Sequence, residues 1–374
     1  ISYVGPTSTA PEADSTVSVP TVMPGIWDCH GHFLGLPDAD VLPGSLNTPQ
    51  ATRAARATRD MATLLSAGIT SVREPGGLGI DLRHAVDDGS VAGPSIYGAG
   101  QILSTTGGHA DVHAYPIDFV AHHPHALGAI CDGIAECLKA VRHNLRRGAA
   151  FIKICASGGV MSEIDHPIHQ QFSGDELRAI VEEAGRAERS VAAHCHGKPG
   201  IMAALEAGVK TIEHGSYLDE EAADAMIESE AILVPTRFVI EELLHMEDAL
   251  PPYAYRKSLL VAEHHGQAMK IAAATGVKIA TGTDIIISGD LYRKATREIT
   301  YLVEAGLAPI DALEAATANG PETLGEQAPH SGQLIEDYDA DVIAFDFNPL
   351  EDWVAWGDPS RVTHVWKGGQ PVKA

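Results

Sequence analysis

Residues 27–33 read WDCHGHF and follow an apolar run that starts near Thr21. Successive side chains of a strand point to opposite faces, so a strand ending here would place His30 and His32 on the same side. Both imidazoles can then reach one metal ion. An HxH pair also arises by chance in a chain with 19 histidines. The position of this pair at the end of a predicted strand favours the metal site.

Four more polar residues lie at the ends of apolar or β-branched runs in the same way. They are Lys153 in FIKICASGG, His194 in AAHCHG, His214 in TIEHGS and Asp284 in ATGTDI. The carboxyl ends of strands are where a (β/α)8 barrel gathers its catalytic groups. Neutral imidazoles suit zinc, and His with carboxylate accommodates other divalent metals. Together with the HxH pair, these residues predict a two-metal hydrolase.

Lys153 is unusual because its ammonium would lie inside an apolar strand. A buried, unpaired ammonium is costly, so such a lysine is paired, neutralised or modified. Reaction with CO2 would turn the amine into an anionic oxygen donor that can bridge two cations. The alternative is a lysine whose head group reaches past the strand end into water. We expect Lys153 to be N6-carboxylated.

Strand and helix signals alternate from about residue 21 to about residue 320. The predicted strands span 21–30, 68–74, 94–100, 150–156, 190–196, 210–215, 231–237 and 277–284. Amphipathic or Ala-rich segments separate them, at 50–67, 132–147, 174–189, 199–207, 219–229, 253–275 and 290–306. Eight such units in 374 residues favour an α/β fold closed into a (β/α)8 TIM-like barrel. The alternative is an open doubly wound sheet, but no GxGxxG follows the first strand.

The two ends of the chain differ from the middle. The last part, SGQLIEDYDADVIAFDFNPL and then VTHVWKGG, has the alternation and turns of antiparallel strands. We predict a small β-sandwich domain built from residues 1–22 and 329–374, beside a barrel of residues 23–328. The chain starts with ISYVG rather than Met, so we expect a processed or truncated N-terminus.

Composition narrows the classes of partner and compartment. The formal net charge is −24, from 50 acidic and 26 basic residues, which disfavours binding to nucleic acid. No apolar stretch reaches about 18 residues, so no membrane span is expected. The five cysteines form no CxxC pair and are predicted to be free, buried thiols. Free thiols slightly favour the cytoplasm over secretion.

Long motifs along nearly the whole chain resemble the metal-dependent amidohydrolase superfamily, in its binuclear branch with a carboxylated lysine. Within that branch the chain is similar to ochratoxinase and to the Xaa-Pro dipeptidase-like enzymes. The motifs are MPGIWDCHGHF, GITSVREPGG, STTGGHAD, IKICASGGVMS, AAHCHGKPGIMAAL, IEHGSYLDEE, TRFVIE, GTD, ATANGP and GQLIEDYDADVIAFDFNPLED. The chain departs from the pattern at its start, where sandwich strands would precede ISYVG, and in a short stretch after His32.

The resemblance implies two divalent metal ions, with zinc as the first choice, and self-association into a homo-oligomer. It assigns the more buried metal to His30, His32 and Asp284. It assigns the more exposed metal to His194 and His214, with Lys153 as the bridge. It also implies that Asp284 takes a proton from a bridging hydroxide and later gives it to the leaving amine.

Two further residues, His109 in TTGGHAD and Tyr217 in HGSYLD, are placed beside the substrate carbonyl by the resemblance. They are the candidates for catalytic groups that stabilise an oxyanion. By composition alone, His109 in its Gly-rich loop is equally well explained as a surface residue. Tyr217 alone is better explained by packing.

Arg237 is the main candidate for binding the substrate. It follows the seventh predicted strand, in PTRFV. A guanidinium can hold a substrate carboxylate through two hydrogen bonds. The alternative is an ion pair away from the substrate. His196 is predicted to orient a neighbour or contact substrate rather than bind metal. Glu163, Asp165 and His166 are expected to line the rim without taking part in chemistry.

The function expected from these residues is hydrolysis of an amide bond that releases an amino acid with a free carboxylate. Dipeptides, N-acyl amino acids and ochratoxin-like conjugates all fit this description. A second possibility keeps the metals and changes the bond to a lactone or phosphoester. A third is a metal-free scaffold, which is disfavoured because every ligand position is filled.

Overall fold

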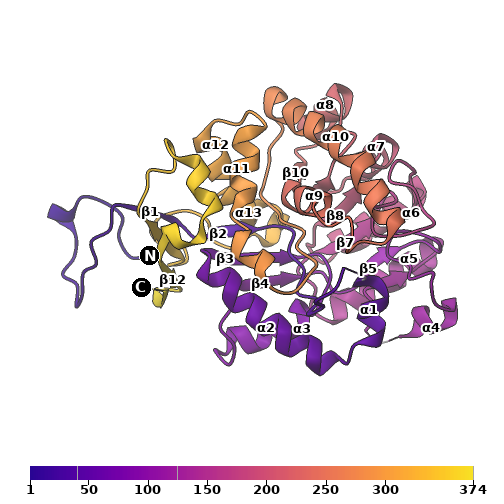
Figure 1. Ribbon diagram of the computed structural model, residues 1–374, viewed down its shortest axis with the longest axis horizontal. Coiled ribbons are helices and arrows are strands. Elements are labelled where there is room, and N and C mark those ends of the chain that lie inside the picture. The colour runs from indigo at the N-terminus through magenta and orange to yellow at the C-terminus, as the bar shows by residue number, and fades with distance from the viewer. Residues whose placement is uncertain (40, 124, 374) are drawn as a thin grey trace.

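The computed structural model describes residues 1–39, 41–123 and 125–373, which form a barrel of parallel strands wrapped by helices (Figure 1). The strands of its wall are β2 (Ile26–Asp28), β3 (Ile69–Glu74), β4 (Ser95–Gly98), β5 (Ile102–Ser104), β6 (Gly128–Ile130), β7 (Ile152–Cys155), β8 (Val191–Cys195), β9 (Thr211–His214) and β10 (Ile232–Val234). One parallel sheet has the order β2-β3-β4, and another has the order β10-β9-β8-β7-β5-β6.

Backbone hydrogen bonds join these two sheets into a closed wall. On one side the Leu233 N–H donates to Lys278 O and the Ala280 N–H to Leu233 O, both at 2.9 Å. The same segment then receives the Cys29 N–H at Thr281 O, at 2.8 Å. On the other side, the Ala150 N–H, just before β7, donates to Gly98 O at the end of β4, at 2.9 Å. The predicted (β/α)8 TIM-like barrel is therefore confirmed.

Three predicted strands differ from the observed ones. The segment 21–30 is divided at Gly25 into β1 (Thr21–Pro24) and β2, because β2 pairs with β3 of the barrel wall whereas β1 pairs with a strand of another sheet, residues 342–345. A Cβ at Gly25 would lie 2.0 Å from Thr70 Oγ1. The segment 94–100 is interrupted after β4, and the chain resumes as β5 beyond Gly100, whose φ is +83°. The segment 277–284 pairs as a strand only at an isolated bridge between Ile279 and Leu233.

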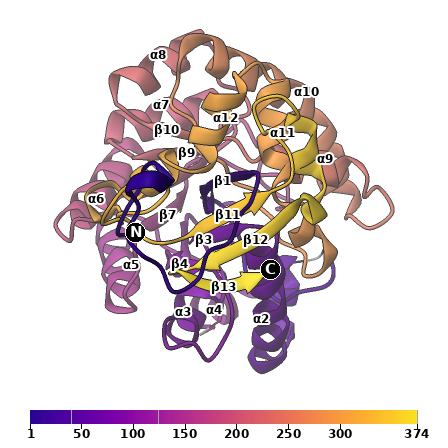
Figure 2. The same ribbon diagram turned by 90° about the vertical axis from the view of Figure 1, so that its left-hand side faces the viewer.

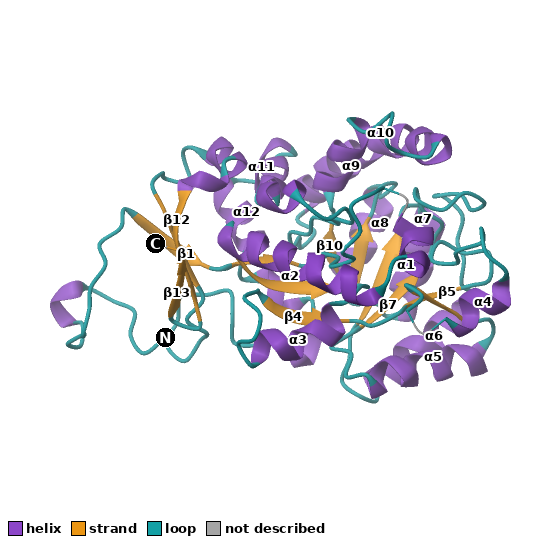
Figure 3. Ribbon diagram, turned by 60° about the horizontal axis from the view of Figure 1, so that its bottom comes forward, coloured by secondary structure: helices purple, strands orange, loops and turns teal. Residues whose placement is uncertain are grey.

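Helices surround the barrel (Figure 3). Those that fall in predicted segments are α2 (Gln50–Ser66), α5 (Ile134–Arg146), α6 (Gly174–Gly185), α7 (Lys198–Ala207), α8 (Glu220–Glu228), α10 (Pro252–Thr275) and α11 (Arg297–Glu304). The others are α1 (Val41–Asn47), α3 (Gly79–Asp87), α4 (Ile117–His122), α9 (Arg237–Leu244), α12 (Pro309–Ala316) and α13 (Asn319–Glu322). Each predicted helical segment thus contains a helix, and the unpredicted ones are mostly short.

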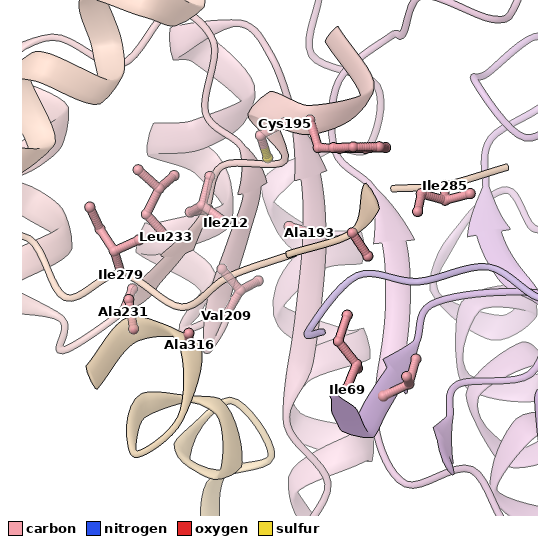
Figure 4. Close-up of a cluster of buried hydrophobic side chains, with 14 of the residues drawn as sticks. Ile69, Ala193, Cys195, Val209, Ile212, Ala231, Leu233, Ile279, Ile285 and Ala316 are labelled. Carbon is pink, nitrogen blue, oxygen red and sulfur yellow. The ribbon is translucent and has the colours of Figure 1, made fainter. Parts of the chain in front are cut away.

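The two faces of the strands bury different sets of side chains. Ala193, Ile212, Leu233 and Ile279 are register partners on neighbouring segments, and they belong to the apolar cluster that includes the helices (Figure 4). Side chains one position away, such as Ala192 and Ile232, form a separate cluster inside the barrel. This alternation follows from the period of two in a strand. It leaves the inward face at the strand ends for polar groups.

Both ends of the chain contribute to a small antiparallel sheet beside the barrel (Figure 2). Its order is β1, β11 (Val342–Phe345), β12 (Val362–Lys367) and β13 (Gln370–Lys373). The N-terminal amine of Ile1 donates to Tyr338 O at 2.7 Å, which ties the first residue to the same region. A small β-domain from both termini is confirmed in outline, while the boundaries at 22/23 and 328/329 stay a prediction.

Among the described residues, no helix has both the length and the hydropathy that crossing a membrane requires. All five cysteines are free and buried, as predicted. Burial raises the pKa of Cys29 and of Cys155 to about 12, so these thiols stay protonated at neutral pH.

Candidate metal centre

His30 and His32 each have one ring nitrogen fixed by a hydrogen bond and the other directed to the same carboxylate. His30 Nδ1 lies 2.6 Å from Glu213 Oε2, and His32 Nδ1 donates to Gly76 O at 2.5 Å. The Nε2 atoms lie 3.6 and 3.2 Å from Asp284 Oδ1. A hydrogen bond to one ring nitrogen that leaves the other free is the usual arrangement of metal-binding histidines.

A second group of imidazoles lies next to the first. His194, His196 and His214 offer ligand atoms within 4.8 Å of one another, and so do His30, His214 and Asp284. Thr236 Oγ1 lies 2.7 Å from His214 Nδ1, which leaves its Nε2 free. His214 therefore belongs to both groups, and each group could hold a metal ion.

Burial favours the neutral form, which is the form that binds metal, for all of these imidazoles except His32. For His32, burial is outweighed by the Asp284 carboxylate, which raises the pKa. Burial lowers the pKa of His30 to about 4 and of His196 to about 3. It also lowers the pKa of His194 and His214 well below the usual range. Burial alone would raise the pKa of Asp284, but the neighbouring imidazoles of His30 and His32 outweigh it and lower that pKa.

Lys153 supports the fit of this cluster to metal ions. Its side chain is 2% exposed, and its Nζ is a buried atom with no hydrogen-bond partner among the described residues. Burial lowers the pKa of the amine. The Glu213 and Asp284 carboxylates favour the charged form, but burial outweighs them, so a neutral amine or a modified one fits better than an ammonium. The residues present thus suit the predicted metals and the predicted carbamate.

The backbone is strained at two of the candidate ligands. His214 has φ +69° and Asp284 has φ +54°, in the left-handed region that residues other than Gly rarely adopt. Such a conformation costs on the order of 1–3 kcal/mol and is concentrated at functional sites. The strain sits at the strand ends, where each backbone turns its side chain toward the same point.

A buried ion pair lies directly behind His30. Arg73 Nη2 is 2.5 Å from Glu213 Oε1, and both side chains are fully buried. Arg73 also donates to Cys29 O at 2.7 Å and to Thr211 Oγ1 at 2.9 Å. Burial alone would raise the pKa of Glu213, but the Arg73 guanidinium lowers it, so the carboxylate is ionised. Glu213 can then orient His30 as a metal ligand.

A cavity opens above these groups and contains about 840 Å³ when its mouth is included. Its polar floor is His30, His32, His109, Lys153, Cys155, His194, His196, His214 and Asp284. Its wall is apolar and includes Leu34, Val41, Ile102, Leu127, Val160, Met161, Val239, Ile240, Leu243 and Ile286. A small polar site in an apolar cavity is the usual form of a small-molecule site.

A model of the amidohydrolase family matches residues 21–372, which is nearly the whole chain. The chain belongs to the amidohydrolase family. The ochratoxinase of Aspergillus niger is 44% identical over 393 residues, covering 100% of this chain and 81% of that protein. The crystal structure of A. niger ochratoxinase has a TM-score of 0.94 at 42% identity, covering 100% of this chain and 89% of that one.

Two further solved structures are similar to this amidohydrolase. A prolidase complexed with N-methylphosphonate-L-proline has a TM-score of 0.87 at 35% identity, covering 96% of this chain and 91% of its own. A Xaa-Pro dipeptidase with bound methionine has a TM-score of 0.85 at 32% identity, covering 94% and 87%. The protein is therefore a metal-dependent amidohydrolase of the ochratoxinase and dipeptidase type, with a small-molecule or peptide-like substrate.

The six residues predicted as metal ligands all line the cavity of this amidohydrolase. His196, which was predicted to contact substrate, lies among them, and its Nδ1 is 2.7 Å from Ser216 Oγ. His109 also lines the cavity and stacks on His194, with 4.3 Å between ring centroids. The assignment of individual ligands to the two metals stays a prediction.

Arg237 and Tyr217 lie outside the residues that line the cavity. Arg237 is the first residue of α9, and its Nη2 is 2.5 Å from Glu241 Oε1. Its Nη1 donates to Ala262 O at 2.9 Å. The Tyr217 ring stacks on His264 at 4.4 Å. Binding a substrate carboxylate would require Arg237 to exchange Glu241 for the substrate.

Glu213 and Arg73 were not singled out from the sequence. Glu213 is one residue before His214 and two after Thr211, so it shares the inward face of β9 with Thr211. A carboxylate inside the apolar run TIEHG was the available signal. No local pattern indicates that its partner would be Arg73, 140 residues earlier in the chain.

Proposed function

We propose that this amidohydrolase cleaves amide bonds and releases an amino acid with a free carboxylate. The substrates would be dipeptides, N-acyl amino acids or ochratoxin-like conjugates with an apolar acyl part. The observation that carries the proposal is the polar floor of the cavity beneath a largely apolar wall. The similarity to proteins named ochratoxinase, prolidase and Xaa-Pro dipeptidase supports the choice of bond.

The cluster at the floor would hold two divalent cations, zinc first. Their proposed ligands are His30, His32, Lys153 as a carbamate, His194, His214 and Asp284. When bound, the cations would supply Lewis acidity toward the scissile carbonyl and a nucleophilic water at neutral pH. Lys153 comes from within strand β7, and the other proposed ligands come from the ends of barrel strands or from the segment that closes the barrel.

Asp284 is the proposed proton carrier. Its carboxylate faces the Nε2 atoms of His30 and His32 and remains 19% exposed, so it can meet water and substrate. Its lowered pKa keeps it ionised at neutral pH, ready to accept the proton of the attacking water. The same oxygen would return that proton to the nitrogen of the leaving amino acid. His109, whose ring stacks on that of His194, would lie beside the scissile amide.

The apolar wall supports a substrate with a bulky apolar group. Val239, Ile240 and Leu243 come from α9, whereas Leu34 and Val41 come from the loop and helix that follow His32. Each buried apolar side chain can contribute roughly 25 cal/mol per Å² of substrate surface that it covers. An aromatic acyl group would bury apolar surface against this wall, whereas a short polar dipeptide would bury little.

A substrate panel tests the function. Purified protein loaded with zinc in bicarbonate buffer is expected to release free amino acids from N-acyl amino acids, dipeptides and ochratoxin A. Aromatic acyl groups should give the highest kcat/KM. A chelator should abolish the activity, and added zinc should restore it. Faster hydrolysis of neutral lactones or phosphoesters, or turnover without metal, would contradict the proposal.

Arg237→Ala tests the proposed carboxylate clamp. If Arg237 exchanges Glu241 for the substrate, the variant should raise KM for amides with a free carboxylate by about 10-fold or more, the loss expected for a charged hydrogen bond. KM for the matching methyl esters should change little. Glu241→Gln serves as the control, because it frees the guanidinium without removing it. Equal effects of Arg237→Ala on acids and esters would leave Arg237 as a structural ion pair.

A further inference from the structure

His109 is held in place over the candidate metal centre by a network that the proposed mechanism has not used. We propose that Asp165 is a positioning residue, which acts through Ser162 to fix the orientation of the His109 imidazole. We further propose that Lys257 of α10 fixes Asp165. This inference deepens the proposed function and rests on it, since it concerns a residue at the same site.

Ser162 connects the side chains of His109 and Asp165. Its Oγ donates to Asp165 Oδ1 at 2.5 Å, because a carboxylate can only accept. The hydroxyl has a single hydrogen, so its oxygen must accept at the 2.8 Å contact with His109 Nδ1. Nδ1 of His109 therefore carries the hydrogen. In the neutral ring, which lines the cavity, this tautomer leaves Nε2 without a hydrogen. Nε2 of His109 then acts as a hydrogen-bond acceptor for an N–H or O–H group of the substrate or water, not as the donor to an oxyanion that the resemblance implied.

The same carboxylate also fixes the backbone of His109. Gln171 Nε2 donates to Asp165 Oδ2 at 3.2 Å, and Gln171 Oε1 accepts from the His109 N–H at 3.1 Å. Asp165 Oδ2 accepts a second bond from the Gly159 N–H at 3.1 Å. One carboxylate, 5% exposed, thus reaches both the main chain and the ring of His109.

Lys257 holds this network from the outside. Its Nζ donates to Asp165 Oδ1 at 3.0 Å and to three backbone oxygens, those of Gly159 at 3.1 Å, Ser162 at 2.6 Å and Asp165 at 2.6 Å. The ammonium is 13% exposed. An ion pair with so many additional hydrogen bonds has a defined geometry, unlike most surface pairs. It attaches the loop after β7 to helix α10.

The loop also contacts the His109 ring directly. A side chain at Gly159 would place its Cβ 2.1 Å from His109 Cε1. The ring therefore lies between Gly159 and the His194 ring, with little freedom to rotate. The alternative is that the network only stabilises the loop. The orientation of His109, and with it kcat, would then be unchanged when the network is removed. Asp165 was expected from the sequence to line the rim, so the proposal changes its role.

Single variants separate these explanations. Asp165→Asn, Ser162→Ala and Lys257→Met are compared with Glu163→Gln, a control that removes an exposed carboxylate from the same loop. With zinc-loaded enzyme and an N-acyl amino acid, the three variants should lower kcat by about 10- to 100-fold, below the full effect of losing a general acid–base group. KM should stay within about threefold, and Glu163→Gln should match the unmodified protein. Unchanged kcat, or a loss confined to KM, would overturn the proposal.

A double variant distinguishes action through His109 from a general effect on the stability of the loop. If Ser162 acts through His109, Ser162→Ala should have little further effect on kcat in a His109→Asn background. If the double variant lowered kcat by the product of the two single-variant factors, Ser162 would act independently of His109, and the proposal would be wrong. Zinc content should be equal in all variants. Lys257→Arg is expected to restore part of the kcat lost in Lys257→Met.

Nitrogen-15 NMR of labelled histidine reports on the network without any turnover. The His109 signals, assigned by their loss in His109→Asn, should show an Nδ1–H tautomer in the zinc-loaded protein. Ser162→Ala should shift them toward a mixture of tautomers. An Nε2–H tautomer in the unmodified protein would contradict the network. Absence of all amide hydrolysis, with the Nδ1–H tautomer intact, would instead count against the proposed function alone.

Discussion

Lys153→Met is expected to lower amide hydrolysis by about 10³-fold or more while leaving the protein folded. The variant removes the only proposed bridge between the cations, and with it several kcal/mol of charge stabilisation. Met is close to Lys in volume, and it removes a buried amine that has no hydrogen-bond partner in the described part of the chain. The thermal midpoint of the metal-free protein should therefore stay equal or rise. Turnover and differential scanning calorimetry measure the two effects.

Lys153→Glu is the matched variant, because it restores an anionic oxygen donor, although on a stem that is three atoms shorter than that of the carbamate. It should retain more activity than Lys153→Met and bind more zinc. The unmodified protein should lose activity when dialysed free of CO2 and regain it with bicarbonate, whereas the glutamate variant should not respond. Full turnover of Lys153→Met would exclude the carbamate.

Arg73→Met is expected to lower the free energy of unfolding by about 3–5 kcal/mol, the usual cost of leaving one member of a buried ion pair alone. Glu213 is fully buried and would keep only Thr211 Oγ1 and His30 Nδ1 as partners. Burial would then raise the pKa of Glu213, and its hydrogen bond to His30 Nδ1 would weaken. Urea unfolding followed by circular dichroism measures the change.

Arg142→Met provides the control on the surface. Arg142 is 62% exposed, and its partner Glu183 also pairs with Arg186. Its loss should change the free energy of unfolding by no more than about 1 kcal/mol. A similar small change for Arg73→Met would mean that the buried pair contributes no more than a surface pair.

The sequence predicted the barrel, and it also indicated the polar residues that the barrel gathers in one cavity, because both depend on local patterns. A strand places alternate residues on one face, so His30 and His32 had to share a side. The apolar run around Lys153 likewise indicated a buried amine that must be paired, neutralised or modified, and its Nζ has no hydrogen-bond partner among the described residues. The observed cluster of His30, His214 and Asp284 follows once these strands close into one wall.

Other features depend on contacts that no local pattern encodes. The first predicted strand is divided at Gly25 because its two halves pair in different sheets, β1 with β11 and β2 with β3. Arg73 and Glu213 meet only because β3 and β9 face each other across the barrel. For Arg237, the spacing to Glu241 was a usable local signal, since residues four apart on a helix can pair. Helix α9 was not predicted, so that signal was not considered.

Asp165 illustrates a further limit. A carboxylate in a loop after a strand is usually solvated, and the sequence offers no sign that Lys257 returns from α10 to meet it. The partners lie 92 residues apart in the chain. Only the tertiary packing of α10 on that loop turns a rim residue into one that reaches His109.

The five sheltered cysteines have a practical consequence for fluorescence work. Bulky maleimide dyes need an accessible thiolate, and the native thiols are all buried. A cysteine introduced on the outer face of α5, for example by Lys139→Cys, would then be the single site of attachment. Dyes could be placed on this enzyme one at a time without first deleting its own sulfhydryl groups.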